Sequence, residues 1–153
     1  MTQSPAMATI EEVTEYAHNG QLEDWIDAFL RAEGNNVPLA DGLKKQKRYW
    51  IGPLQFPLKR LSRCCGPEEE MEYRVSLEDW NGKVASLIEY IKSGGELAPF
   101  IVQYRQGIFS IRDGSHRYGA FEKMSLKTYW TLIWCDSEEA FAEMKTKLSG
   151  PVL

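Results

Sequence analysis

Five consecutive residues, Asp113-Gly114-Ser115-His116-Arg117, bring together groups that proteins use to bind phosphate. Arg117 can donate two parallel hydrogen bonds to phosphate oxygens, and His116 and the Ser115 hydroxyl can each donate one. Gly114 lets the backbone approach an anion closely. Each charge-assisted hydrogen bond is worth about 1.5–3 kcal/mol, so several together support micromolar binding after the cost of association. The run therefore predicts a phosphate-binding turn.

Asp113 cannot favour a bare phosphate, because both groups are negatively charged. Its carboxylate is better suited to holding Mg²⁺, to orienting Arg117, or to acting on the hydroxyl of a substrate. A Ser-His-Asp hydrolase is disfavoured, because Asp113, Ser115 and His116 are too close in sequence for the orienting geometry. The sequence also lacks a Walker A loop and a Rossmann glycine pattern.

The surrounding residues predict a strand that ends at this run and a helix that begins there. Residues 99–104 and 108–111 are rich in β-branched and aromatic side chains and flank Gln106-Gly107, which indicates two strands joined by a tight turn. Apolar residues from Tyr118 to Met124 are typical of a helix. The start of such a helix has unpaired N–H groups at the positive end of its dipole, which attract anions.

The charges at this helix start are unusual. His116 and Arg117 stand in the first turn, where positive charge is unfavourable unless an anion binds. The alternative is that Asp113 or Ser115 simply caps the helix while the two basic side chains point into water.

The order of these features resembles the ParB/sulfiredoxin superfamily. The resemblance covers about the last two thirds of the chain. It lies in a helix ending in Gly, the segment Pro99-Phe100-Ile101-Val102, a strand ending in Asp-Gly-x-His-Arg-x-x-Ala, a helix and an aromatic strand. It implies an α+β fold, with a small mixed β-sheet flanked by helices, and nucleotide binding through the Gly-x-His-Arg turn. Among such proteins, small stand-alone kinases with Asp-Gly before the His-Arg pair are the most similar in size and motif.

The resemblance also implies roles for residues outside the turn. The segment before the long helix often helps to wall the nucleotide site in this superfamily. Arg60 and Arg63 are therefore expected to reach phosphates, and Glu68 to serve as a base or as a carboxylate beside the metal. An ordinary charged surface is the alternative for each of them. The expected catalytic residues are Asp113, Glu68 and His116, with Asp113 as the metal ligand.

The expected function is a Mg²⁺-dependent phosphotransferase or NTPase that uses ATP or CTP, with a small hydroxyl-bearing compound as the possible acceptor. The alternative is a non-enzymatic, ParB-like module associated with nucleotide or DNA. Sulfiredoxin chemistry is disfavoured, because Ser115 stands where those proteins have the reactive Cys, although Cys64 or Cys65 could be argued as substitutes. The acidic net charge and the lack of a recognisable cluster of metal-binding carboxylates argue against a nuclease.

Bulk properties set wider limits. The 153 residues are 43% hydrophobic and 26% charged, which is typical of one globular domain. A net charge of −4 gives no general attraction to DNA. No apolar run is long enough to span a bilayer and no signal peptide is recognisable, so we expect a cytoplasmic protein. The three cysteines are expected to be reduced thiols, and the oligomeric state cannot be deduced from one sequence.

Two regions are expected, a helical extension over residues 1–48 and a core domain over residues 49–153. In the extension, residues 1–7 are expected to be disordered, two helices follow over 9–16 and 22–30, and residues 35–48 form a polar connector. A basic run in this connector, Lys44 to Arg48, is expected to be a solvated loop or helix end.

The core is expected to begin with an edge segment interrupted by Pro53 and Pro57. A long helix opens at Ser76 or Asp79 and stops at Gly94. Residues 128–135 form a strand buried on both faces, and a last helix opens at Asp136 or Ser137 and closes at Gly150-Pro151.

Overall fold

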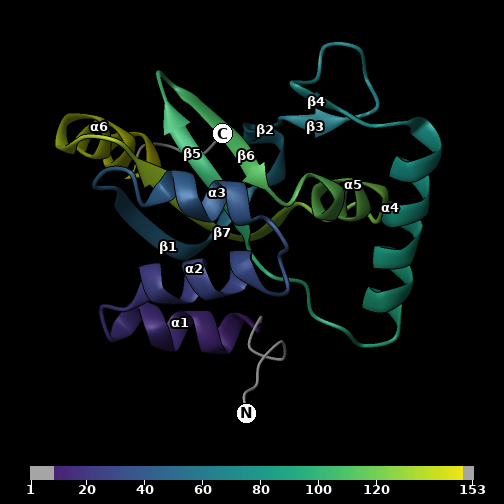
Figure 1. Cartoon of the computed structure of the whole chain (residues 1–153), viewed down its shortest axis with the longest axis horizontal. Coiled ribbons are helices and arrows are strands. Elements are labelled where there is room, and N and C mark those ends of the chain that lie inside the picture. Colours follow the sequence, from purple (N-terminus) through teal and green to yellow (C-terminus); the bar gives the residue numbers. More distant parts are fainter. Residues whose placement is uncertain (1–8, 150–153) are drawn as a thin grey trace.

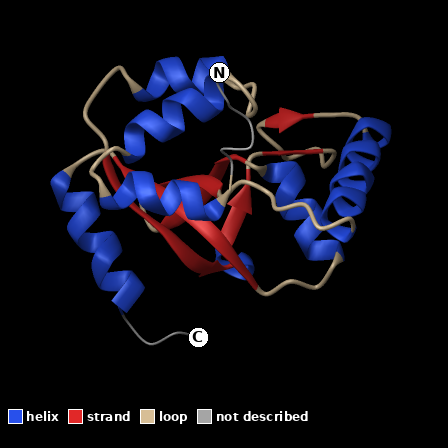
Figure 2. Ribbon diagram, turned by 90° about the horizontal axis from the view of Figure 1, so that it is seen from below, coloured by secondary structure: helices blue, strands red, loops and turns tan. Residues whose placement is uncertain are grey.

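A computed structural model describes residues 9–149 of the chain. Its centre is a five-stranded mixed sheet with helices packed on both faces (Figure 1, Figure 2). The sheet contains β1 (Tyr49–Pro57), β7 (Thr128–Cys135), β5 (Phe100–Arg105), β6 (Ile108–Asp113) and β2 (Leu61–Arg63), in that order. A separate two-stranded ribbon pairs β3 (Cys65–Gly66) with β4 (Tyr73–Arg74). The helices are α1 (Ile10–His18), α2 (Leu22–Arg31), α3 (Val37–Leu43), α4 (Leu77–Lys92), α5 (Ser115–Lys123) and α6 (Glu138–Ser149), with a 3₁₀ turn, η2, over Leu58–Arg60.

The sheet confirms the predicted α+β class. Strand β5 pairs antiparallel with β6 and parallel with β7, whereas β1 joins β7 antiparallel and β2 joins β6 parallel. Strand β1 lies at an edge, as its two prolines require, because a central strand needs N–H donors on both sides. The last five residues of β7 are buried, which confirms the predicted burial of both its faces.

Alternate residues of the central strands face two different cores. Phe100 and Ile133 point to a core shared with α5 and α6, where Phe121 and Met144 are buried. Ile101 and Leu132, their neighbours in sequence, point to a core shared with the N-terminal helices. The buried residues that these helices contribute are Val13, Trp25, Ile26, Phe29, Leu30 and Ala40. The period of two in a strand explains how one sheet supports helices on both sides. The N-terminal extension therefore covers the part of this face formed by β1, β7 and β5.

The polar connector predicted for residues 35–48 is wrong over its middle part, where α3 forms. Pro38 signals a break in the sequence, but at the first turn of a helix proline is favourable because that N–H has no partner anyway. Asn36 caps this helix, its side-chain oxygen accepting a hydrogen bond from the N–H of Leu39 at 3.4 Å. Within α3 itself Ala40 is the buried residue, so the seven-residue helix has little hydrophobic periodicity to reveal it.

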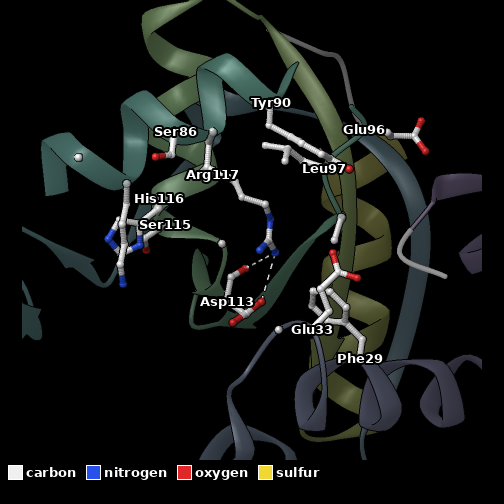
Figure 3. A pocket seen from close by; sticks show the side chains of 16 residues that line it. Phe29, Glu33, Ser86, Tyr90, Glu96, Leu97, Asp113, Ser115, His116 and Arg117 are labelled. Atoms are coloured by element: carbon white, nitrogen blue, oxygen red, sulfur yellow. Dashed lines mark hydrogen bonds and ion pairs between the residues drawn. The ribbon is translucent and has the colours of Figure 1, made fainter. Parts of the chain in front are cut away.

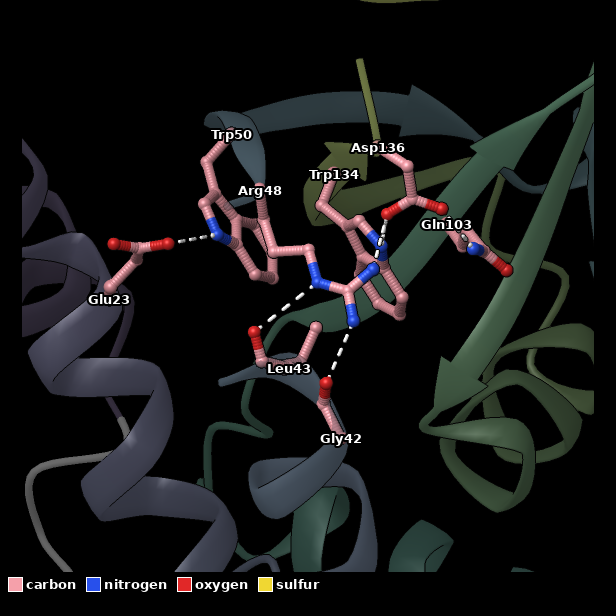
Figure 4. A network of polar contacts seen from close by, with 8 residues as sticks. All are labelled: Glu23, Gly42, Leu43, Arg48, Trp50, Gln103, Trp134 and Asp136. Atoms are coloured by element: carbon pink, nitrogen blue, oxygen red, sulfur yellow. Dashed lines mark hydrogen bonds and ion pairs between the residues drawn. The ribbon is translucent and has the colours of Figure 1, made fainter. Parts of the chain in front are cut away.

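Arg48 joins this extension to the sheet (Figure 4). Its Nε donates to the carbonyl of Leu43 at 3.2 Å and its Nη2 to the carbonyl of Gly42 at 2.7 Å, both at the end of α3. Its Nη1 forms an ion pair with Asp136, which directly follows β7. Asp136 also accepts hydrogen bonds from Gln103 at 3.1 Å and from the Trp134 indole at 3.2 Å. The predicted solvated basic run is therefore wrong at Arg48, whose side chain is 12% exposed.

Three helix starts follow the sequence closely. The hydroxyls of Thr9, Ser76 and Ser137 accept hydrogen bonds from backbone N–H groups three residues further on, as capping residues do. The predictions for residues 1–7 and for Gly150-Pro151 lie outside the described residues. Within residues 9–149, none of the helices combines the length and the apolar character needed to cross a bilayer.

Candidate functional site

The predicted phosphate turn begins α5. Gly114 is the residue before the helix and has φ 120°, a conformation that L side chains rarely adopt, and no side chain caps the helix. The alternative that Asp113 or Ser115 caps this helix is therefore wrong. The N–H groups of Ser115, His116 and Arg117 belong to the first turn, where the helix itself supplies no acceptors. The local structure thus has the uncapped helix start expected of an anion site.

Two pockets lie against this turn and share Asp113, Gly114, Ser115 and His116. The first, here called the α4 pocket, has a volume of about 480 Å³ and is also lined by residues of α4, Arg117 and the loop after α2. The second, the α3 pocket, has a volume of about 510 Å³ and extends to α3, Cys64, Cys65 and Tyr73. Both volumes lie within the roughly 300–1,000 Å³ that is usual for small-molecule sites. The turn therefore separates two spaces, either of which can hold a compound.

The α4 pocket places basic groups from two helices around the turn. Lys83 of α4 lines it. His116 and Arg117 of α5 line it as well (Figure 3). The His116 ring lies 4.7 Å from the ring of Trp80, and its Nε2 atom is buried without a hydrogen-bond partner among the described residues. Burial lowers the pKa of His116, and the positive charges of Lys83 and Arg117 lower it further. His116 is therefore neutral at pH 7, with a buried nitrogen ready to bind a ligand.

Arg117 is held in place by the strand that precedes it. Its Nη2 donates to the Pro99 carbonyl at 2.9 Å and to Oδ2 of Asp113 at 3.2 Å. The other carboxylate oxygen of Asp113 accepts a hydrogen bond from Asn36 at 3.0 Å. Three roles were predicted for Asp113, and the contact with Arg117 corresponds to one of them, the orienting of Arg117. The Nε of Arg117 is buried without a partner among the described residues, which leaves it one donor for a ligand.

Sequence reasoning missed Lys83, Ser86 and Glu33 in this pocket. Lys83 and Ser86 are three residues apart and so lie on one face of α4, the long helix in which the sequence predicts no site residue. A Lys and a Ser at this spacing are a weak signal, because nothing local indicates that this face meets α5. Glu33 follows α2, and Figure 3 shows its carboxylate turned toward the Arg117 guanidinium. Burial raises the pKa of Glu33, while Arg117 lowers it.

Arg63 and Glu68 lie behind His116 and outside the lining of both pockets. Arg63 donates to Glu68 at 2.7 Å, and its guanidinium lies 4.8 Å from the ring of Trp80, the residue that contacts His116. Gly66 makes room for the pair, because a Cβ there would lie 2.1 Å from Nη1 of Arg63. Arg63 is therefore linked to His116 through the Trp80 ring.

Arg60 is further from the turn. Its guanidinium lies over the rings of Phe56 and Phe109, at 5.1 and 5.3 Å from their centres. The structure thus brings together Asp113, Gly114, Ser115, His116 and Arg117 and leaves Arg60, Arg63 and Glu68 outside both pockets.

The α3 pocket has a different character. Pro38, Leu39 and Tyr73 give it apolar surface, and Arg112 is the basic side chain in its lining. Burial raises the pKa of both the Cys64 and the Cys65 thiol, so they remain protonated at neutral pH. All three cysteines of the chain are free, as the sequence predicts. Cys64 and Cys65 therefore act here as small, weakly polar wall residues.

Within residues 9–149, no group of three or more His, Cys, Asp or Glu side chains is placed to hold a metal ion by itself. Asp113 forms an ion pair with Arg117, and the Glu33 carboxylate is turned toward the same guanidinium (Figure 3). A metal ion here would need oxygen ligands from a bound compound as well.

No family model and no curated protein matches the sequence. Among solved structures, sulfiredoxin from Arabidopsis thaliana is 24% identical, with 62% of this chain and 94% of that chain covered and a TM-score of 0.42. Free serine kinase in complex with AMP is 17% identical over 59% of this chain and 32% of its own, with a TM-score of 0.38. Chromosome-partitioning protein ParB from Caulobacter crescentus, complexed with CTP-γ-S, is 22% identical over 67% of this chain and 56% of that chain, also with a TM-score of 0.38.

The chain thus spans about a third of the length of the free serine kinase and about half that of the ParB structure. At these identities and TM-scores the likeness says nothing about the ligand, which has to be argued from the residues of this chain. The protein has an α+β fold whose solved neighbours include ParB and sulfiredoxin, the two proteins that give the resembled superfamily its name.

Proposed function

We propose that the chain binds a nucleotide, ATP or CTP, in the α4 pocket, with its phosphates at the start of α5, and that it transfers or releases the terminal phosphate. The observation that carries this proposal is the uncapped start of α5, which opens into a pocket containing Lys83, His116 and Arg117. The sequence resemblance makes a nucleotide the first phosphate compound to test.

The electrostatics favour a polyphosphate over a neutral ligand. The helix dipole places partial positive charge at the turn, and the first-turn N–H groups can donate to phosphate oxygens. Lys83 adds a point charge from α4, and Arg117 adds its unpartnered Nε. A phosphate beside His116 would also favour the protonated imidazole, which the apo pocket disfavours. Clustered positive charges repel one another when no anion is bound, and a bound anion would offset this repulsion.

Phosphate transfer requires an acceptor oxygen near the turn. In the proposed step, a hydroxyl oxygen of the acceptor, or of water, forms a bond to the terminal phosphorus. The bond from that phosphorus to the bridging oxygen breaks, and the nucleoside diphosphate leaves. Asp113 lines both pockets and is the group proposed to take the hydroxyl proton.

Within the described residues, the protein can supply only part of the oxygen ligands that Mg²⁺ needs at this turn. Each oxygen of Asp113 makes one hydrogen bond and keeps a second lone pair, and phosphate oxygens would supply the remaining ligands. We therefore propose Asp113 as its protein ligand. Bound there, Mg²⁺ would neutralise charge that develops on the phosphates.

Arg60, Arg63 and Glu68 lie outside both pockets, and the proposal gives none of them a contact with the nucleotide. Arg63 positions His116 through Trp80, and Glu68 holds Arg63 in turn. Direct contact of Arg60 or Arg63 with phosphate, and a catalytic role for Glu68, stay predictions.

Nucleotide binding is tested by calorimetric titration with ATP and with CTP in the presence of Mg²⁺. Lys83→Met keeps the length of the side chain but removes the charge, and loss of one charge-assisted bond of about 1.5–3 kcal/mol weakens binding about 10- to 150-fold. Lys92→Met is the matched control, because Lys92 is an exposed residue in the last turn of the same helix and does not line the pocket. We expect it to bind like the wild type.

Turnover is tested separately with nucleotide labelled at the terminal phosphate. Label that moves to a small molecule indicates a kinase, and label that appears as inorganic phosphate indicates an NTPase. Absence of binding by the wild type, or equal binding by Lys83→Met and Lys92→Met, would contradict the proposed site.

A further inference from the structure

The α3 pocket shares the phosphate turn with the α4 pocket but offers a different chemistry. Its walls come from α3, from the residues after β2 and from the β3–β4 ribbon, and nothing in the proposed nucleotide binding uses them. We propose that the α3 pocket binds the phosphate acceptor, and that this acceptor is a hydroxyl compound with an apolar body and a carboxylate. The place of this compound in a reaction rests on the proposed function, but its binding does not.

The apolar body follows from the walls. Pro38 and Leu39 of α3 face the pocket together with Tyr73 and the two thiols, Cys64 and Cys65. Burial keeps these thiols protonated, so they add neither charge nor a strong hydrogen-bond donor. A polyphosphate would find too few donors among these walls, whereas an aliphatic or aromatic chain can cover them.

The carboxylate follows from Arg112. Its Nη1 donates to the Ser110 hydroxyl at 3.1 Å and pairs with Oε1 of Glu72 at 3.2 Å, and its Nη2 donates to Oε2 of Glu72 at 3.3 Å. Both terminal nitrogens thus meet the two oxygens of one carboxylate, the geometry in which arginine binds carboxylates best. Glu72 shows that the guanidinium is already oriented for such a group.

Glu72 is also easy to displace. Its side chain is 54% exposed, while that of Arg112 is 21% exposed. An ion pair with one partner in water contributes little, because water and salt compete for it. A ligand carboxylate that arrives with an apolar body would gain the contacts with the pocket walls as well. We infer that such a ligand replaces Glu72 on Arg112.

The hydroxyl follows from the shared turn. The pocket reaches from Arg112 to Asp113 and His116, which also line the α4 pocket. A compound that holds its carboxylate on Arg112 therefore has its other end beside the turn, where the terminal phosphate of the nucleotide is proposed to lie. An alcohol at that end is the group that can accept phosphate.

Cys65 gives a direct measure of occupancy. It lines the α3 pocket and is partly exposed, whereas Cys64 and Cys135 are buried. The rate at which iodoacetamide modifies Cys65, followed by mass spectrometry at mildly alkaline pH, should fall when the pocket is filled. The probes are 4-(hydroxymethyl)benzoate and 6-hydroxyhexanoate. Their uncharged partners, 4-(hydroxymethyl)benzamide and 1,6-hexanediol, keep the body and the hydroxyl.

We expect at least one acid to slow modification about tenfold at ten times its Kd, and both neutral compounds to have little effect. Arg112→Gln should abolish the protection, and Arg105→Gln should keep it, since Arg105 ends β5 away from this pocket. Glu72→Gln alters an exposed residue and should make the acid protect at lower concentration. Protection by neither acid, equal protection by acid and neutral partner, or unchanged protection in Arg112→Gln or Glu72→Gln would overturn the proposal.

This measurement is made without nucleotide, so it separates the two hypotheses. Protection by an acid in a protein that fails to bind ATP and CTP would refute the proposed function and leave the carboxylate site standing. Nucleotide binding without protection by either acid would refute the carboxylate site and leave the proposed function standing.

Discussion

Arg48 offers a sharp test of how the N-terminal extension is fixed to the sheet. Its side chain is 12% exposed and serves three acceptors, the carbonyls of Leu43 and Gly42 and the carboxylate of Asp136. Arg48→Ala removes all three interactions at once. The two carbonyls lose their side-chain donor, and Asp136 keeps only the neutral donors Gln103 and Trp134.

The expected loss of stability is large for one side chain. Breaking a buried ion pair by removing one partner costs about 3–5 kcal/mol. Asp136 is 34% exposed and retains two hydrogen bonds, so we lower this range to about 2–4 kcal/mol. For a chain of this size each kcal/mol corresponds to about 2–4 °C, so Tm should fall by about 5–15 °C.

Arg31→Ala is the matched control. Arg31 also joins two helices, through Asp27 at 2.9 Å and Asp41 at 2.8 Å, but its side chain is 36% exposed and that of Asp41 is 60% exposed. We expect a much smaller loss than for Arg48→Ala, as for other exposed pairs. Urea denaturation of both variants, with the slope m compared between them, gives the two free energies of unfolding. Similar losses for both, or a loss below about 1 kcal/mol for Arg48→Ala, would refute the reasoning.

Two further predictions concern the turn. Gly114→Ala should lower the free energy of unfolding by about 1–3 kcal/mol and weaken nucleotide binding, because φ is 120° there and a Cβ would lie 2.9 Å from Arg117 Nη2 and from Phe100 Cδ1. Thermal denaturation and titration with ATP check this prediction, and unchanged values would contradict the strained turn. Folding lowers the pKa of His116, so the unfolded chain binds more protons, and stability should fall as pH drops below about 6.5 and through the folded pKa. His116→Asn should lose less stability than the wild type between about pH 7.5 and 5.5 in urea denaturation, and an equal loss would show that His116 does not titrate differently on folding.

The parts of the fold that were predictable depend on local patterns. Alternation and β-branched residues identified β5, β6 and β7, and apolar spacing identified α1, α2, α4 and α6, with capping hydroxyls marking the starts of α1, α4 and α6. The turn before α5 was predictable for the same reason, because a strand, a glycine and a helix follow one another directly. The short elements α3, β2, β3 and β4 were missed, since they have too few residues to show a period. In addition, β2 forms only by pairing with the distant strand β6, and β3 and β4 only by pairing with each other.

The site was predictable only where it is continuous in sequence. Lys83 faces the turn because α4 packs closely on α5, where a Cβ on Gly119 would lie 2.7 Å from the Trp80 ring. Glu33 and Asn36 reach the turn through the folding of the extension over the sheet. Arg63 and Glu68 pair over Gly66, where a Cβ would lie 2.1 Å from Nη1 of Arg63 and 2.6 Å from Oε1 of Glu68. The placements of Lys83, Glu33 and Asn36 depend on the packing of elements far apart in the chain, which residue types alone do not encode.

The hydrogen bond from Asn36 to Asp113 joins residues 77 positions apart. It has a practical consequence for anyone who trims the protein to its sheet-containing half. A fragment beginning at Tyr49 would retain the glycine and the first-turn amides of α5, yet it would lack Glu33 on one flank and Pro38 and Leu39 on the other. Such a fragment would have only part of the lining of each pocket, so its failure to bind a small molecule would say little about the intact chain.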